Sequence, residues 1–101
     1  MNILISCPPI SDEFGYYCYI DCIIRTSLKE YDVSFHPSIF YRFTYNNISQ
    51  FDDTLRQTDI LMLSCYVWNW ELQLALADHA RKINPDIIIV GGGPQVHKPY
   101  Y

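Results

Sequence analysis

Long hydrophobic runs are missing from this sequence. The longest apolar stretches lie around Ile60–Leu63 and Ile87–Val90, and they fall far below the ~18 residues that a bilayer-spanning helix needs. The start of the chain also lacks the basic segment and the small-residue cleavage site of a secretory signal. We therefore predict no transmembrane helix, no membrane partner and a cytoplasmic location.

Positive charge is scarce as well. Seven Lys and Arg residues stand against eleven Asp and Glu residues, which leaves a net charge of −4. A protein that binds the phosphate backbone of nucleic acid needs a cluster or stripe of basic side chains. The sequence contains no such stripe, so we do not expect nucleic acid to be a partner.

Several motifs of cofactor sites are absent. The sequence holds no Gly-x-Gly-x-x-Gly or Walker pattern, and no cysteine triplet with three and then two residues between ligands, as an iron–sulfur cluster would need. Cys18 and Cys22 would share one face of a helix, but no second closely spaced ligand pair accompanies them. We interpret the four cysteines as small, reduced, apolar residues of a cytosolic chain.

Apolar and aromatic residues, by contrast, are plentiful. Half of the 101 residues are hydrophobic and sixteen are aromatic, nine of them tyrosine. This composition is enough for one buried core and excludes a disordered tail. Because tyrosine combines apolar area with a hydroxyl group that needs a partner, part of this aromatic load is expected to line a pocket or an interface.

Hydrophobic periodicity predicts alternating strands and helices. The helix over Asn69–Ile83 has the strongest pattern, with an N-cap residue at Asn69, two basic residues in its last turn and Asn84-Pro85 as a stop signal. Ile39–Tyr45 fits either an extra strand or an ordered loop. The other expected strands are Asn2–Ser6, Asp32–His36, Asp59–Ser64 and Asp86–Val90, and the other expected helices are Phe14 to about Leu28 and a short helix through Ile48, Phe51 and Leu55.

This alternation predicts an α/β fold with a parallel sheet covered on both faces. Right-handed crossovers favour a flavodoxin-like (Rossmann-like) strand order of 2-1-3-4. Four strands are fewer than the roughly five or six strands of a typical sheet. We therefore expect residues 1–101 to form a single domain that is truncated at its C-terminal side, either the N-terminal part of a larger protein or a unit that completes itself in a homodimer.

Three unusual loops follow strands that should end at one edge of the sheet. They are Ser6–Pro9, Ser64–Asn69 and Gly91–Val96. Ligands of open parallel sheets bind outside the carboxyl ends of the strands, and consecutive glycines let a ligand approach the backbone closely. Each of these features also has a purely structural explanation. The glycines could form a simple turn, Ser64 could bond to the local backbone, and Trp68 could form a hydrophobic staple with its own helix. Together the loops favour a large, flat, partly apolar ligand.

The same loops carry a resemblance to a known family. The segments Asp59–Asn69, Ile83–Asp86 and Ile87–Gln95, with the opening Asn2–Pro9, resemble the N-terminal cobalamin-binding domain of cobalamin-dependent radical S-adenosylmethionine enzymes. The resemblance implies a module that holds cobalamin for methyl transfer or radical chemistry. It implies no catalytic residue and no metal ligand in this chain, and it implies these cofactor-binding residues: Cys7, Pro8, Pro9, Ser64, Cys65, Tyr66, Val67, Trp68, Asn69, Gly91, Gly92, Gly93, Pro94 and Gln95.

Two departures from related patterns limit what the resemblance implies. The Asp-x-His-x-x-Gly motif, whose histidine ligates cobalt in other cobalamin folds, is absent, which implies base-off cobalamin without histidine ligation. His36 and His97 remain alternative ligands, and His79 is expected to be solvated. The catalytic domain that would bind a [4Fe-4S] cluster and S-adenosylmethionine is missing, so it would act in cis or in trans and this chain alone would not catalyse the reaction.

Two other function classes stay open at this point. The first is a ligand-free α/β module for interaction or oligomerisation, because an incomplete sheet would expose an open edge and apolar area. The second is a flavin or nucleotide binder on the same fold, because fold alone does not decide the ligand.

Overall fold

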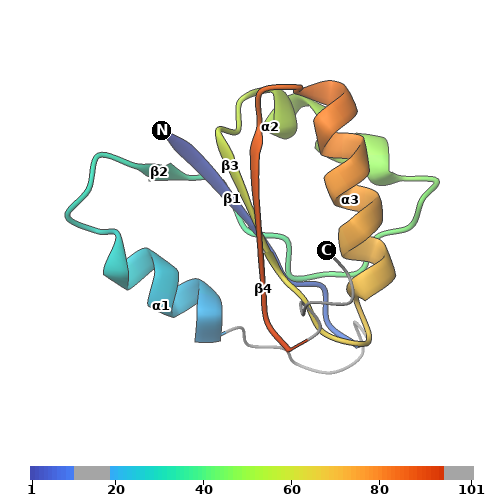
Figure 1. Cartoon of the computed structure of the whole chain (residues 1–101), viewed down its shortest axis with the longest axis horizontal. Helices are drawn as coiled ribbons and strands as arrows, with labels where there is room; N and C mark the ends of the chain where they lie inside the picture. The colour runs from blue at the N-terminus through green and yellow to red at the C-terminus, as the bar shows by residue number, and fades with distance from the viewer. Residues whose placement is uncertain (11–18, 95–101) are drawn as a thin grey trace.

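Four parallel strands form the sheet of the protein. The computed structural model describes residues 1–10 and 19–94. All three neighbouring strand pairs are parallel, and the order is β2-β1-β3-β4 (Figure 1). The predicted α/β class and the 2-1-3-4 strand order are confirmed. The strands are β1 (Asn2–Ser6), β2 (Ser34–Phe35), β3 (Ile60–Ser64) and β4 (Ile88–Gly92).

The register of the strands decides which side chains share a face. Successive side chains along a strand point to opposite faces of the sheet. Residues that are paired between neighbouring parallel strands therefore form rows on one face. Two adjacent rows, which lie on opposite faces, are Leu4–Leu61–Ile89 and Ile5–Met62–Val90.

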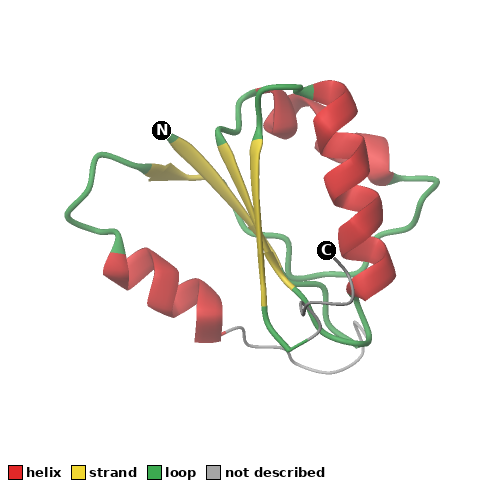
Figure 2. Ribbon diagram, viewed as in Figure 1, coloured by secondary structure: helices red, strands yellow, loops and turns green. Residues whose placement is uncertain are grey.

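Helices α2 (Asp52–Arg56) and α3 (Trp70–Ile83) cover the face with the leucine row (Figure 2). A 3₁₀ turn over Ile48–Phe51 leads into α2. Leu76 of α3 and Leu55 of α2 are fully buried in one cluster with the leucine row. The burial of this apolar stripe, more than helix propensity, stabilises α3.

His79 connects the two helices of this face. Its Nε2 lies 2.6 Å from Oδ1 of Asp52, and both side chains are only about a quarter exposed, at 23% and 25%. The expectation that His79 is solvated is therefore wrong. His79 lies in the middle of α3 and faces the start of α2. The helical periodicity of the sequence does not reveal that α2 is its neighbour.

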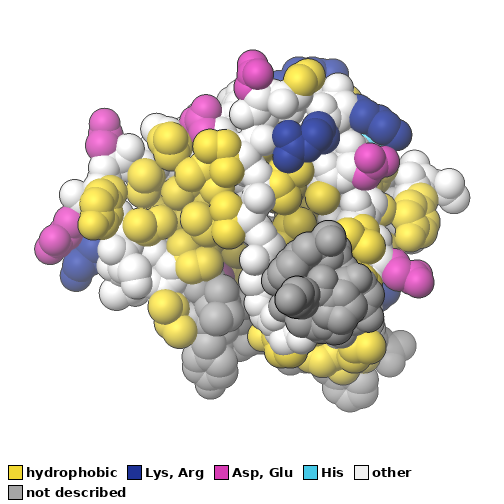
Figure 3. Space-filling view, viewed as in Figure 1, with side chains coloured by type: hydrophobic (Ala, Val, Ile, Leu, Met, Phe, Trp, Pro, Cys, Tyr) yellow, Lys and Arg dark blue, Asp and Glu magenta, His cyan; other side chains and the backbone are white. Residues whose placement is uncertain are grey.

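Helix α1 (Tyr19–Ser27) lies on the opposite face and covers only part of it (Figure 1). Arg25 forms an ion pair with Asp21 and donates to the hydroxyl of Ser38, and this hydroxyl donates in turn to Asp21, which holds the helix near β2. Ile88 and Val90 of β4 remain 53% and 47% exposed, and Figure 3 shows hydrophobic side chains gathered on this side of the molecule. Among residues 1–10 and 19–94, the expected cover on both faces is thus incomplete over β4.

Several boundaries differ from those expected from the sequence. Strand β4 starts two residues later than predicted and continues through Gly91 and Gly92, because these glycines pair with Leu63 and Ser64 of β3. The segment Ile39–Tyr45 is an ordered loop that touches the sheet through one bridge, between Ser6 and Ile39. The predicted start of the first helix, at Phe14, lies outside the described residues.

Within the described part of the chain, the longest helix has fourteen residues, and none is both long and apolar enough to cross a membrane.

Candidate functional site

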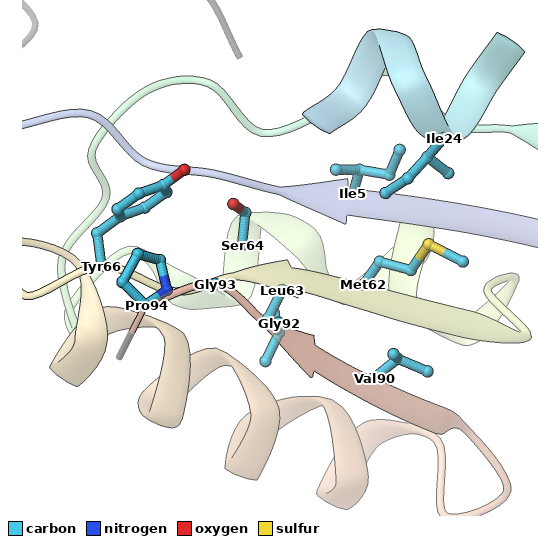
Figure 4. A pocket seen from close by; sticks show the side chains of 10 residues that line it. All are labelled: Ile5, Ile24, Met62, Leu63, Ser64, Tyr66, Val90, Gly92, Gly93 and Pro94. Atoms are coloured by element: carbon cyan, nitrogen blue, oxygen red, sulfur yellow. The ribbon is translucent and has the colours of Figure 1, made fainter. Parts of the chain in front are cut away.

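An apolar cavity of about 310 Å³ opens at the carboxyl edge of the sheet, on the face with α1. Its deeper end is formed by side chains of three strands and by Ile24 of α1, and its outer end by the loops after β3 and β4 (Figure 4). Two hydroxyl groups, of Ser64 and Tyr66, belong to the outer end. The lining residues are Ile5, Ile24, Met62, Leu63, Ser64, Tyr66, Val90, Gly92, Gly93 and Pro94.

The two glycines at the cavity have different roles. A Cβ atom built on Gly92 meets nothing within 4 Å, so this glycine leaves open space beside the cavity. A Cβ atom on Gly93 would lie 2.5 Å from the carbonyl oxygen of Cys65, and Gly93 has a φ of +103°. Only glycine adopts such a φ without strain. The backbone conformation therefore requires glycine at position 93, whereas Gly92 leaves space in the cavity.

An aromatic pair follows β3. The rings of Tyr66 and Trp68 stack with their centroids 4.5 Å apart and their planes at 6°. A hydrophobic staple at Trp68 would need an apolar partner at the fourth helical position, but Gln73 occupies that position. Trp68 therefore does not form the staple, and its ring packs on the ring of Tyr66.

The indole nitrogen of Trp68 lacks a partner. Its Nε1 is buried and makes no hydrogen bond within the part of the chain that the structure describes. Trp68 also lines a second hollow of about 410 Å³ on the outer side of the loop, together with Arg42, Val67 and Trp70 among others. A buried donor without an acceptor is costly, and this nitrogen is the buried side-chain donor that lacks one among the described residues.

The predicted site residues fall into three groups. Ser64, Tyr66, Gly92, Gly93 and Pro94 come together around the cavity, while Val67 and Trp68 face the second hollow. Gln95 lies outside the described residues. The other predicted residues do not line the cavity. Four of them are buried, Cys7, Pro8, Pro9 and Asn69, and two line a hollow beside α3, Cys65 and Gly91.

Asn69 differs most from its expected role. It precedes α3 as predicted, but its side chain makes no cap hydrogen bond to the helix. It is 1% exposed and bonds instead to the loops, with Oδ1 accepting from the backbone N–H of Tyr66 at 2.8 Å. The side chain of Asn69 is therefore engaged in hydrogen bonds within the protein, and it supports the loops.

Reasoning from the sequence missed several residues of the cavity wall. Ile5, Met62 and Val90 lie on three predicted strands. Side chains along a strand alternate between the two faces of the sheet, so this period could have placed Met62 on the same face as Ser64, together with its neighbours Ile5 and Val90. Ile24 had no comparable signal, because nothing in its helix indicates how α1 lies across the sheet.

About half of the chain matches a short part of two methyltransferases. No family model matches the sequence. A cobalamin-dependent radical SAM methyltransferase, TokK of Streptomyces tokunonensis, is 37% identical over 49 residues, which cover 48% of this chain and 7% of that protein. The 2-(S-pantetheinyl)-carbapenam-3-carboxylate methyltransferase of Streptantibioticus cattleyicolor is 33% identical over 54 residues, which cover 54% of this chain and 8% of that protein. The matched stretch is thus less than a tenth of either relative.

The described residues offer no metal site of their own. No group of three or more His, Cys, Asp or Glu side chains is placed to hold a metal ion in the described ranges. His36 contacts the carbonyl oxygen of Gln57 at 3.4 Å, which lies before β3 and so at the amino edge of the sheet. His36 therefore lies away from the cavity, and His97 lies outside the described residues.

Cys7 and Cys65 are two buried cysteines of the loops after β1 and β3. Both are at most 1% exposed. Burial raises the pKa of the Cys65 thiol to about 11, the nearby Cys7 adds to this increase, and a backbone hydrogen bond with Gly92 opposes it. The thiol form of Cys65 therefore predominates at neutral pH, and this residue does not behave as an activated nucleophile.

This raised pKa predicts a loss of stability in alkaline solution. The Cys65 thiol of the unfolded chain ionises near its ordinary pKa of 9.0, whereas the folded thiol keeps its proton to about 11. Unfolding then releases a proton, so the free energy of unfolding falls as the pH rises through this window, by about 2–3 kcal/mol. Urea unfolding at about pH 8 and about pH 10.5 measures most of this fall, about 2 kcal/mol.

Cys65→Ala is the matched variant for this measurement. Other groups titrate equally in both proteins, so the difference between the two pH dependences isolates Cys65. An identical alkaline slope in the wild type and in Cys65→Ala would contradict the predicted effect.

Proposed function

We propose that this chain is a cobalamin-binding module of a radical S-adenosylmethionine enzyme. The observation that carries the proposal is the apolar cavity at the carboxyl edge of the sheet, where the loop after β3 meets Gly92–Pro94. This is the edge at which ligands of open parallel sheets bind. The partial likeness to a cobalamin-dependent radical SAM methyltransferase supports the same ligand class.

The cavity fits the nucleotide tail of cobalamin better than its corrin ring. Its volume of about 310 Å³ is too small for the whole macrocycle and sufficient for one bicyclic aromatic base, at the lower end of the ~300–1,000 Å³ of small-molecule pockets. Ile5, Met62 and Val90 would contact the base, and the open space at Gly92 would admit it. The hydroxyl groups of Ser64 and Tyr66 would bond to the polar part of the tail at the mouth.

The corrin ring would then lie over the loop after β3. The stacked rings of Tyr66 and Trp68 give that loop a flat apolar surface, which suits the face of a macrocycle. A flat aromatic surface in this loop is consistent with this ligand.

The protein would hold cobalamin without a histidine ligand to cobalt. His36 and His79 of the described residues lie at the opposite edge of the sheet and between two helices. When bound, the cofactor would supply a cobalt ion for methyl transfer or radical chemistry. The chain's residues would bind and orient the cofactor, and a separate catalytic domain, in cis or in trans, would supply the [4Fe-4S] cluster and S-adenosylmethionine.

Titration with hydroxocobalamin tests the proposal. The visible absorption bands of the cofactor are expected to shift on addition of the purified chain and to saturate at an equimolar ratio. Flavin mononucleotide is the control ligand, because it is also flat and aromatic but belongs to the competing ligand class. Unchanged cobalamin bands at high protein concentration, or stronger binding of the flavin, would overturn the proposal.

The exposed apolar side chains of β4 favour one competing function. Ile88 and Val90 lie on an edge strand, and such an edge can pair with a second chain. A chain that binds no cobalamin but sediments as a dimer would support the interaction module instead.

A further inference from the structure

We propose that Arg42, Asn69 and Gln73 are positioning residues, which hold the loops after β1 and β3 together and so prepare the cofactor surface before the cofactor binds. We call these three side chains the loop clamp. The inference rests on the proposed function and deepens it, because it assigns a role in cofactor binding to residues that do not touch the cavity.

Gln73 forms the first link of the loop clamp. It is fully buried on α3, and its Nε2 donates to the carbonyl oxygens of Ser6 at 2.7 Å and Ser64 at 3.1 Å. Its Oε1 accepts from the hydroxyl of Ser6 at 2.9 Å. One amide group therefore joins the last residue of β1 to the last residue of β3.

Asn69 forms the second link, one step further out. Its Nδ2 donates to the carbonyl oxygens of Pro8 at 3.0 Å and Ser64 at 3.1 Å. Its Oδ1 accepts from the backbone N–H of Tyr66 at 2.8 Å. The same side chain thus fixes the β1 loop and the residue that carries one of the stacked rings.

Arg42 forms the third link, from the loop between β2 and the following 3₁₀ turn. Its Nη1 donates to the carbonyl oxygens of Pro9 at 2.9 Å and Trp68 at 3.1 Å. The three links therefore join Ser6, Pro8 and Pro9 in turn to the end of β3 and the loop that follows it. Tyr66 and Trp68, the two stacked residues, are both held through their backbone.

The chemistry of the β1 loop explains why side-chain donors are needed. Pro8 and Pro9 have carbonyl acceptors but no N–H to donate, so they cannot extend the hydrogen-bond ladder between β1 and β3 in the usual way. Buried carbonyl groups without partners are costly. Amide and guanidinium groups supply the missing donors, and each of them reaches two carbonyl groups at once.

The consequence concerns binding and not only stability. Ordering a loop during binding reduces affinity, and a loop that is already ordered avoids this cost. The loop clamp holds the Tyr66–Trp68 stack in place within the protein itself. Loss of one link should therefore release the stack and weaken cobalamin binding, even where the domain stays folded.

Two variants remove single links, and a third serves as the control. Gln73→Met keeps the length and burial of the side chain but removes its donors. Arg42→Lys keeps the charge, but a single ammonium group lacks the planar fork of guanidinium. Leu76→Val is the control, because Leu76 lies one turn further along α3 in the core and makes none of these bonds.

Three measurements separate positioning from stability. Urea unfolding reports the stability of each variant, hydroxocobalamin titration reports affinity, and near-ultraviolet circular dichroism reports the order of the stacked rings without any cofactor. Gln73→Met and Arg42→Lys are expected to lose most of the ring signal and to bind cobalamin about tenfold more weakly, because the released rings would have to be ordered again on binding. Leu76→Val is expected to keep both the ring signal and the affinity.

The outcomes distinguish the two proposals. If the wild type binds cobalamin and both link variants bind it equally well, the loop clamp is refuted and the proposed function stands. If the wild type binds no cobalamin, the proposed function fails, and the circular dichroism signal of the rings then tests the loop clamp by itself. Retention of this signal in both link variants refutes the loop clamp. Loss of the signal supports it.

Discussion

Replacing Gly93 with alanine is expected to destabilise the domain by about 2–4 kcal/mol, because the new Cβ atom adds a steric clash to a strained backbone. The Cβ atom would lie 2.5 Å from the carbonyl oxygen of Cys65 and 2.9 Å from its backbone nitrogen. Both contacts are to backbone, so no side chain can rotate away. The φ of +103° adds a conformational cost for any residue other than glycine.

The clash would act on the site as well as on stability. The backbone N–H of Cys65 donates to the carbonyl oxygen of Gly92 at 2.7 Å, which joins the loops after β3 and β4. Relief of the clash would separate these two loops and change the mouth of the cavity. The loss should therefore appear in both the urea midpoint and the cobalamin affinity.

Gly92→Ala is the matched control for this prediction. The two glycines are neighbours, but a Cβ atom on Gly92 meets nothing within 4 Å. We expect Gly92→Ala to change the free energy of unfolding by less than about 1 kcal/mol, since glycine is itself unfavourable in a strand. Equal losses in the two alanine variants would contradict the distinction between the backbone role of Gly93 and the cavity role of Gly92.

The strands were predictable because their signals are local. β1 and β3 appear as short apolar runs bounded by proline or polar residues, and parallel sheets bury such runs. β4 was placed too early, since Gly91 and Gly92 look like a turn in sequence but are paired with β3. The identity of the neighbouring strand, which no local pattern contains, decides where the strand ends.

The site was predictable at the level of its loops and not at the level of individual side chains. The three loops were expected at one edge because parallel strands end together, and the cavity lies at that edge. The roles within the loops depend on partners far along the chain: Gln73 bonds to Ser6 across 67 residues, and Arg42 to Trp68 across 26. A single sequence shows that Gln73 and Arg42 are polar, but it does not show what they bond to.

The same argument explains the aromatic excess. Phe43 is buried against Phe51 with ring centroids 5.2 Å apart, so part of the cluster at Phe40–Tyr45 serves the core. Tyr66 and Trp68 stack on each other at the carboxyl edge, in the place expected for a ligand surface. The composition indicated more aromatic residues than a core needs. Only the tertiary structure shows which of them lie in the core and which lie at the site.

Gly92→Leu is expected to abolish high-affinity cobalamin binding while the domain stays folded. Gly92 lines the cavity and has open space where a side chain would project, so the leucine would occupy the volume proposed for the nucleotide base. Excluding one aromatic ring from an apolar cavity forfeits about 3 kcal/mol, which corresponds to a loss of about 100-fold in affinity.

The control for this variant lies on the same strand. Ile88→Leu also changes an apolar residue of β4, on the same face two pleats away, but Ile88 does not line the cavity. Hydroxocobalamin titration should give wild-type affinity for Ile88→Leu and the large loss for Gly92→Leu, with similar urea midpoints for both. A folded Gly92→Leu protein that binds cobalamin as tightly as the wild type would show that the nucleotide tail lies elsewhere. The role of the stacked Tyr66 and Trp68 rings would then have to be tested separately, because their surface does not depend on the cavity.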